Sequence, residues 1–99
     1  NNDFNGALEV LNKIKTLSGN HLQAYEMSAR FCIEQNQLNR AREEINFVLE
    51  KSPDRASAIF LNGIIFQRSG QIDEACAQFK RSSELGFREA KEALAKFCR

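Results

Sequence analysis

The chain has 99 residues, of which 42% are hydrophobic and 27% are charged, and its formal net charge is +1. This length is typical of a single domain, and the composition is that of a globular protein rather than a disordered one. No apolar run approaches the roughly 18 residues that a membrane span needs. The near-zero net charge and the lack of a dense basic stripe argue against nucleic acid as a partner.

Apolar residues recur throughout the chain with the i, i+3, i+4 and i+7 spacing of amphipathic helices, and no stretch alternates as a strand would. Turn-forming residues separate the apolar stretches at Ser18-Gly19-Asn20, Asn36-Gln37, Ser52-Pro53-Asp54, Ser69-Gly70 and Leu85-Gly86. The sequence therefore predicts an all-α fold with six helices, over residues 4–17, 21–35, 38–51, 55–69, 72–84 and 87–98.

The chain is similar to itself at an offset of about 34 residues, a period typical of stacked helical repeats that bury their apolar faces only against their neighbours. Small residues align as Ala7, Ala41 and Ala75, and larger apolar residues align as Leu11, Ile45 and Phe79. We call the step from Ala41 to Ala75 the repeat offset. Gly63 lies in the middle of a predicted helix, where glycine costs about 1 kcal/mol relative to alanine, so we expect another helix to approach closely there.

The repeats resemble those of the tetratricopeptide repeat (TPR) family, whose signature combines an aromatic residue, Leu-Gly and Tyr with later Ala, Phe and Pro positions. Residues 56–89 match this signature with Ile59, Asn62-Gly63, Phe66, Ala75 and Phe79. Residues 22–55 match it with Tyr25, Ser28-Ala29, Cys32, Ala41, Ile45 and Pro53. The departures are Ser28 and Asn62 where Leu is usual, and Gly19 and Phe87 where Pro is usual.

This resemblance implies a right-handed α-α superhelix (a TPR solenoid) of six antiparallel-paired helices. Residues 1–21 would be the second helix of a truncated repeat, residues 22–55 and 56–89 two repeats, and residues 90–99 a capping helix. At the repeat offset Phe97 falls where Ala29 and Gly63 lie, so we expect the carboxyl end of the array to be closed. Because the chain opens within its repeat pattern and without an initiator Met, we expect it to be a piece of a longer protein.

The resemblance also implies a concave groove, lined by the first helix of each repeat, that binds a peptide or helical segment of another protein. The candidate partner-binding residues are Arg30, Ser57, Phe60, Ile64, Gln67, Arg68, Lys91 and Leu94. The helix predicted over 55–69 is apolar almost all round, so Phe60 and Ile64 fit either an exposed groove or the core.

The sequence is consistent with two functions. The first is a protein-interaction module with a scaffold or adaptor role that binds an apolar or amphipathic segment. The alternative is a structural spacer or a self-association segment of a longer TPR solenoid, forming a homodimer through Leu8, Leu11 and Ile14 of the first helix.

Catalytic and metal chemistry have little support in the sequence. His21 is the only histidine, it lies in a predicted turn, and no glycine-rich phosphate-binding loop is present. We therefore expect no enzymatic activity, no metal and no cofactor. Cys32, Cys76 and Cys98 lack the tight spacing of a zinc site, and we expect them to be thiols, either in the core or on the surface. Thiols of this kind weakly favour a reducing compartment such as the cytoplasm.

Overall fold

The computed structural model describes residues 22–98, and every regular element in that range is an α-helix. The helices are α2 (Leu22–Glu34), α3 (Leu38–Lys51), α4 (Ala56–Arg68), α5 (Ile72–Glu84) and α6 (Arg88–Phe97). The predicted all-α fold is confirmed, and each of these helices begins and ends within one residue of its predicted limits. The helix predicted over residues 4–17 lies outside the described residues.

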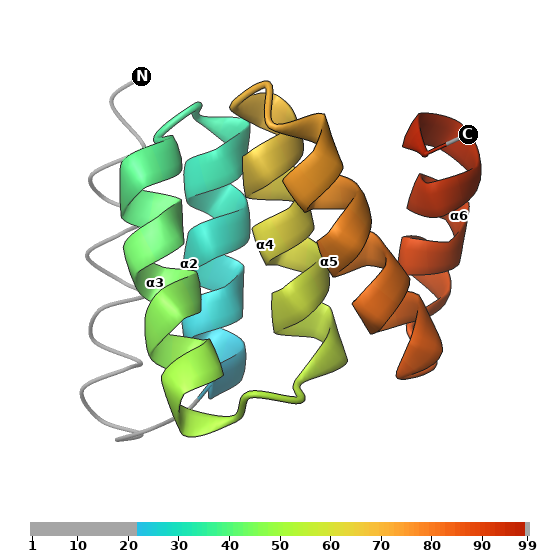
Figure 1. Cartoon of the computed structure of the whole chain (residues 1–99). Coiled ribbons are helices and arrows are strands. Elements are labelled where there is room, and N and C mark those ends of the chain that lie inside the picture. The colour runs from blue at the N-terminus through green and yellow to red at the C-terminus, as the bar shows by residue number, and fades with distance from the viewer. Residues whose placement is uncertain (1–21, 99) are drawn as a thin grey trace.

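The helices pack in two layers (Figure 1). Helices α2 and α4 lie side by side, with α3 packed on α2 and α5 packed on α4. Helix α4 therefore contacts α2, α3 and α5, whereas α6 packs on α5 at the carboxyl end of the array. None of the helices within residues 22–98 is long and apolar enough to cross a membrane.

Three of the four connections between these helices are the same three-residue turn. Each has a central residue with positive φ, where glycine or asparagine is favoured. These residues are Asn36 (φ 60°), Gly70 (φ 82°) and Gly86 (φ 98°). In each turn the next amide donates to a carbonyl five residues earlier: Gln37 to Cys32 (2.7 Å), Gln71 to Phe66 (2.9 Å) and Phe87 to Ser82 (3.1 Å). This pattern is the Schellman motif, which satisfies the last carbonyls of a helix.

The connection between α3 and α4 is different. It has four residues, Ser52–Arg55, includes Pro53 and contains no residue with positive φ. Helix α3 is also one residue longer than α5 (14 against 13). Helix α6 therefore begins two residues earlier in the repeat than α4 does. Two residues correspond to a rotation of about 200° around a helix axis. The shift therefore turns toward α5 a side of α6 that differs from the one that the repeat offset predicts.

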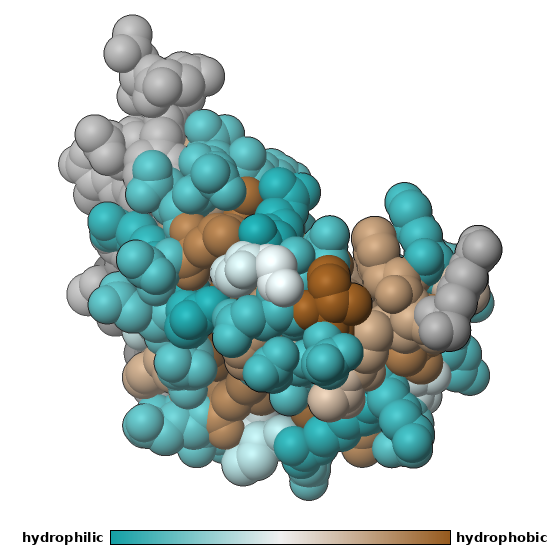
Figure 2. Space-filling model, turned by 45° about the horizontal axis from the view of Figure 1, so that its top comes forward, coloured by the Kyte–Doolittle hydropathy of each residue, from teal (hydrophilic) through white to brown (hydrophobic). Residues whose placement is uncertain are grey.

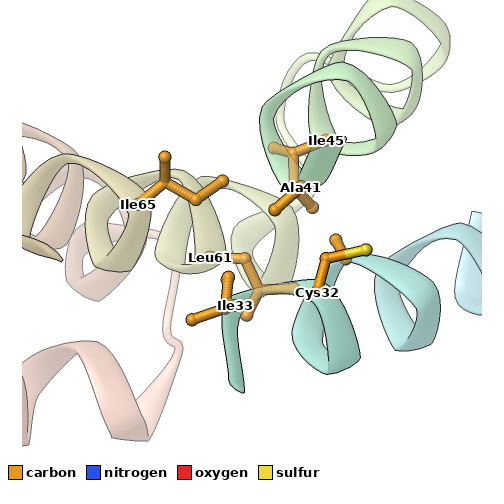
Figure 3. Packing of buried hydrophobic residues seen from close by; sticks show 7 residues of the cluster. Cys32, Ile33, Ala41, Ile45, Leu61 and Ile65 are labelled. Carbon is orange, nitrogen blue, oxygen red and sulfur yellow. The ribbon is translucent and has the colours of Figure 1, made fainter. Parts of the chain in front are cut away.

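The largest group of buried residues lies between α2, α3 and α4 (Figure 3). We call it the first core cluster: Ala29, Cys32, Ile33, Ala41, Ile45, Leu61 and Ile65. The second core cluster consists of Ala75, Phe79 and Ala93, and it joins α5 to α6. Ala75 and Phe79 follow Ala41 and Ile45 by one repeat offset, but Ala93 follows Leu61 by two residues less. We call this second step, from Leu61 to Ala93, the shortened offset.

The contacts of α6 thus follow the shortened offset, and the alignment of the last helix at the repeat offset does not hold in space. Phe97 takes the place of the buried Ile65 rather than that of Gly63, yet it is 36% exposed, so apolar surface remains uncovered at this end. A second pair of equivalent contacts also follows the shortened offset. Arg42 of α3 lies over the ring of Phe66. Cys76 follows Arg42 by the repeat offset, Cys98 follows Phe66 by the shortened offset, and these two cysteines are joined.

Cys76 and Cys98 form a disulfide, with their Cα atoms 5.8 Å apart and a sequence separation of 22. The prediction that these two cysteines are thiols is therefore wrong, while Cys32 stays a thiol buried in the first core cluster. The pairing depends on how α6 lies on α5, which the spacing of the cysteines does not show. Closing a loop of this length stabilises a fold by about 3 kcal/mol in the chain-entropy model. The argument from cysteines for a reducing compartment accordingly loses its basis.

Gly63 lies at a close approach of α4 and α5. A Cβ atom at this position would lie 2.6 Å from Cε1 and 2.7 Å from Cδ1 of Phe79, whose side chain is fully buried. The expected close helix approach is therefore found, and a phenylalanine ring fills the space beside the glycine. The corresponding pair in the preceding repeat is Ala29 and Ile45, both fully buried.

We expect Gly63→Ala to lower the free energy of unfolding by about 1 kcal/mol or more, because overpacking against Phe79 outweighs the better helix propensity of alanine. Introducing Gly63→Ala into a Phe79→Ile background reproduces the Ala29 and Ile45 pair and should be neutral or stabilising. Chemical denaturation of the two single variants, the double variant and the wild type measures this coupling. The same cost for Gly63→Ala in both backgrounds would contradict the close-contact explanation.

Candidate protein-binding surface

Polar and apolar residues at matching repeat positions of α2 and α4 form one surface, which we call the inner face. It consists of Gln23, Arg30 and Glu34 of α2 and of Ser57, Phe60, Ile64, Gln67 and Arg68 of α4. The three residues of α2 are exposed, as is Arg68, while the other residues of α4 are half-buried. Six of the eight candidate residues predicted from the sequence therefore lie on α2 and α4, two helices that contact each other.

Glu26 occupies a matching position on α2 but is buried, with 8% of its surface exposed. Its carboxylate accepts hydrogen bonds from Arg55 Nε at 2.8 Å, from a second Arg55 nitrogen at 3.2 Å and from Ser57 Oγ at 2.6 Å. Both donors lie at the start of α4. Because charge-assisted bonds are stronger than neutral ones, this cluster holds the start of α4 against α2. Ser57 is therefore engaged within the protein.

Phe60 lies one repeat after Glu26, and its contacts are aromatic instead. Its ring centroid lies 5.7 Å from that of Phe79 and 5.2 Å from that of Phe87. Phe87 immediately precedes α6 just as Arg55 immediately precedes α4. In both repeats the residue before a helix thus contacts the inner face of the helix two positions earlier. Arg55 does so through an ion pair with Glu26, and Phe87 through its ring against Phe60.

Phe60 and Ile64 belong partly to the core and partly to the surface. Both side chains pack against the first core cluster and against the second, and both remain half-buried rather than fully buried. They are therefore the outer edge of two core clusters and also apolar surface on the inner face. Apolar patches reach other parts of the surface as well: the view in Figure 2, in which the inner face is not turned to the reader, shows brown atoms among hydrophilic ones in the middle of the molecule and on the side where α6 lies.

Two arginines give the inner face positive charge. Arg30 and Arg68 are both exposed, and neither forms an ion pair with another residue in the described part of the chain. Glu34, also exposed, is the acidic residue of this face. The guanidinium groups are free to turn toward a bound carboxylate, which an arginine can hold with two parallel hydrogen bonds.

Lys91 and Leu94 do not join this surface in the same way. At the shortened offset Lys91 corresponds to Ile59 and Leu94 to Asn62, whose amide donates to Gln78 Oε1 of α5 at 3.4 Å. They therefore lie on the side of α6 that corresponds to the α5-facing side of α4. Lys91 is exposed, and Leu94 packs against the second core cluster.

Sequence reasoning missed Arg55 and Phe87 as residues that shape the inner face. Each stands immediately before a helix, where only the tertiary structure shows that it reaches back to the preceding repeat. Within residues 22–98 no three His, Cys, Asp or Glu side chains are grouped as a metal site would require. His21 lies outside the described residues.

Comparisons with known proteins identify the fold. No protein-family model matches the chain, and no curated protein matches it in sequence. A solved structure described as "MamA RS-1 ArsTM double mutant", a TPR-containing protein, is similar, with a TM-score of 0.70 and 21% sequence identity. The match covers 86% of this chain and 48% of the other, so this chain spans about half the length of that protein. The described residues therefore have a TPR-like helical repeat fold.

We expect Arg55→Ala to lower the free energy of unfolding by about 1–3 kcal/mol, because it leaves the buried carboxylate of Glu26 without its charged partner. The matched control is Arg81→Ala. Arg81 pairs with Asp54 at 2.8 Å, but their side chains are 53% and 79% exposed, so we expect a loss of less than about 1 kcal/mol. Urea denaturation gives both values, and equal losses would show that burial of Glu26 does not matter.

Proposed function

We propose that this chain is a protein-interaction module in which the inner face of α2 and α4 binds a segment of a partner protein. A TPR-like fold supports a scaffold role with protein partners in general. The observation that carries the more specific proposal is the apolar surface of Phe60 and Ile64, flanked on the same face by the exposed Arg30 and Arg68. Because such folds generally serve binding rather than catalysis, the proposal includes no catalytic step.

The chemistry of the inner face indicates what kind of segment would fit. Half-buried Phe60 and Ile64 lose their remaining contact with water only when another apolar group covers them, and this burial favours association. Since α2 and α4 lie side by side, an apolar side chain placed on Ile64 would lie near Arg30, its counterpart one repeat earlier. An extended or helical segment with apolar anchors and acidic neighbours satisfies both requirements.

The arginines would contribute orientation and association rate more than affinity. Exposed charges act through solvent, where a single ion pair contributes about 0–1 kcal/mol to binding. Two permanent positive charges on one face nevertheless disfavour the binding of basic segments. Gln67, half-buried on α4, can both donate and accept a hydrogen bond. Together they would select an acidic segment over a basic one of equal hydrophobicity.

The alternative function, a spacer or self-association segment, rests on Leu8, Leu11 and Ile14, which lie outside the described residues. It is distinguished from partner binding by sedimentation. A dimer that persists after charge reversal of the inner face, with no partner captured, would favour the alternative.

The test compares charge reversals on two faces. In Arg30→Glu with Arg68→Glu both changes lie on the inner face, whereas the control, Arg40→Glu with Lys80→Glu, makes the same change in net charge at exposed positions of α3 and α5. A partner captured from a lysate is identified, and its binding segment is synthesised and titrated against the three proteins. We expect the inner-face variant to bind about tenfold to a hundredfold more weakly, because attraction becomes repulsion, and the control to bind as the wild type does.

Circular-dichroism melting of all three proteins accompanies the titration, since the four substituted residues are exposed and their replacement should leave the helices intact. Equal weakening by both variants would reduce the effect to overall charge. Unchanged binding by the folded inner-face variant would remove the inner face as the binding surface.

A further inference from the structure

Helix α6 is attached to less of the molecule than its counterpart α4. Helix α4 packs on α2, α3 and α5, whereas α6 packs on α5 and makes little contact with α4 (Figure 1). The side chains that α6 buries are small: Ala90 is fully buried and Ala93 is 6% exposed. Ala93 takes the place that the much larger Leu61 has in the first core cluster. The apolar contact that holds α6 is therefore smaller than the contact that holds α4.

The disulfide occupies the position that a non-covalent contact occupies in the preceding repeat. At the interface of α3 and α4, the guanidinium carbon of Arg42 lies 5.6 Å from the centroid of the Phe66 ring. At the interface of α5 and α6 the corresponding residues are Cys76 and Cys98. Cys98 is the residue immediately after α6, so the covalent bond holds the end of this helix, the part farthest from the turn that connects it to α5.

This crosslink is accessible from solvent. Both of its cysteines are only half-buried, and exposed residues lie next to them in sequence or one helical turn away: Phe97 (36% exposed) precedes Cys98, and Ile72 (41% exposed) lies four residues before Cys76. Cys32, by contrast, is fully buried. A thiolate from outside can therefore reach the disulfide more readily than it can reach Cys32.

We propose that the Cys76–Cys98 disulfide is a redox-responsive crosslink that determines whether the last turns of α6 stay packed on α5. The reductant is a dithiol, either a small molecule or a protein. One of its thiolates attacks a sulfur of the crosslink, which breaks the protein disulfide and forms a mixed disulfide. The second thiol then displaces the protein sulfur. Overall Cys76 and Cys98 gain two electrons and two protons, and the dithiol is oxidised to a disulfide.

The consequence of reduction is confined to the carboxyl end. Once the bond is broken, the apolar contacts that remain at the end of α6 include those of Ala93, Leu94 and Cys98 in the second core cluster and that of Phe97 with Phe79, whose ring centroids lie 6.3 Å apart. Separation of this end from α5 uncovers the part of the Phe79 ring that Phe97 covers, an apolar surface that is fully buried in the oxidised protein. The turn at Gly86 keeps its own hydrogen bonds, and α2, α3 and α4 keep their core cluster. The inference therefore goes beyond the proposed binding role of the inner face and does not depend on it.

Hydrogen exchange followed by mass spectrometry tests this inference on the wild-type chain, oxidised and after treatment with dithiothreitol. We expect amides of residues 92–97 to exchange at least about tenfold faster in the reduced protein, while those of α2, α3 and α4 change little. A dye that binds exposed apolar surface should gain fluorescence on reduction. Thiol titration in denaturant establishes the two states, with one thiol per chain when oxidised and three when reduced.

Two variants serve as controls. Cys98→Ser should exchange in α6 like the reduced wild type under both conditions, whereas Cys32→Ala should still respond to dithiothreitol. Equal protection of α6 in the oxidised and reduced wild type would overturn the proposal, because the crosslink would then be a static support. Three thiols per chain after incubation in an oxidising glutathione buffer would overturn it as well. Since the reduced wild type carries no substitution, a variant that fails to fold leaves the test intact.

Discussion

The contact between the ring of Phe79 and the backbone of Gly63 is the one on which α4, α5 and α6 all depend. Because Gly63 has no Cβ, the two helices come so close that the Phe79 ring lies 2.6 Å from the position that a Cβ would take. The same fully buried ring also contacts the rings of Phe60 and Phe97. One glycine in a helix interior, unfavourable by itself, thereby allows a single aromatic side chain to join three helices.

The inner face owes its mixed character to a change of chemistry between two equivalent interfaces. Arg55 and Glu26 join α2 to α4 with charge-assisted hydrogen bonds, whereas Phe87 and Phe60 meet as rings where α4 approaches the start of α6. A buried ion pair leaves little for a ligand to bind, but partly covered rings leave apolar surface. The face is polar over α2 and carries its apolar residues, Phe60 and Ile64, on α4, and this difference is a by-product of how each repeat is joined to the next.

Most of the fold could be predicted from the sequence because helix limits depend on local patterns. Amphipathic spacing and residues such as Asn36 and Gly70 mark helix ends without reference to the rest of the chain. The sequence could place Phe60 and Ile64 on one side of α4 because they lie four residues apart, but a partner-binding role for them stays a prediction. Prediction failed on α6 because it used the repeat offset across the connection between α5 and α6, which is shorter than the connection between α3 and α4. The signal was present, since Leu85-Gly86 resembles Ser69-Gly70 more than it resembles the turn around Pro53.

By itself, then, the sequence determined the helices, their turns and the need for a close approach at Gly63, all of which depend on residues near one another along the chain. Only the tertiary structure decided which side of α6 meets α5, and with it the pairing of Cys76 with Cys98. The physical reason is rotation: two residues fewer before a helix turn it by about 200°, so a small change in length selects a different set of contacts. The engagement of Glu26 by Arg55 was decided in the same way, because their contact spans 29 residues and appears only once α2 and α4 lie side by side.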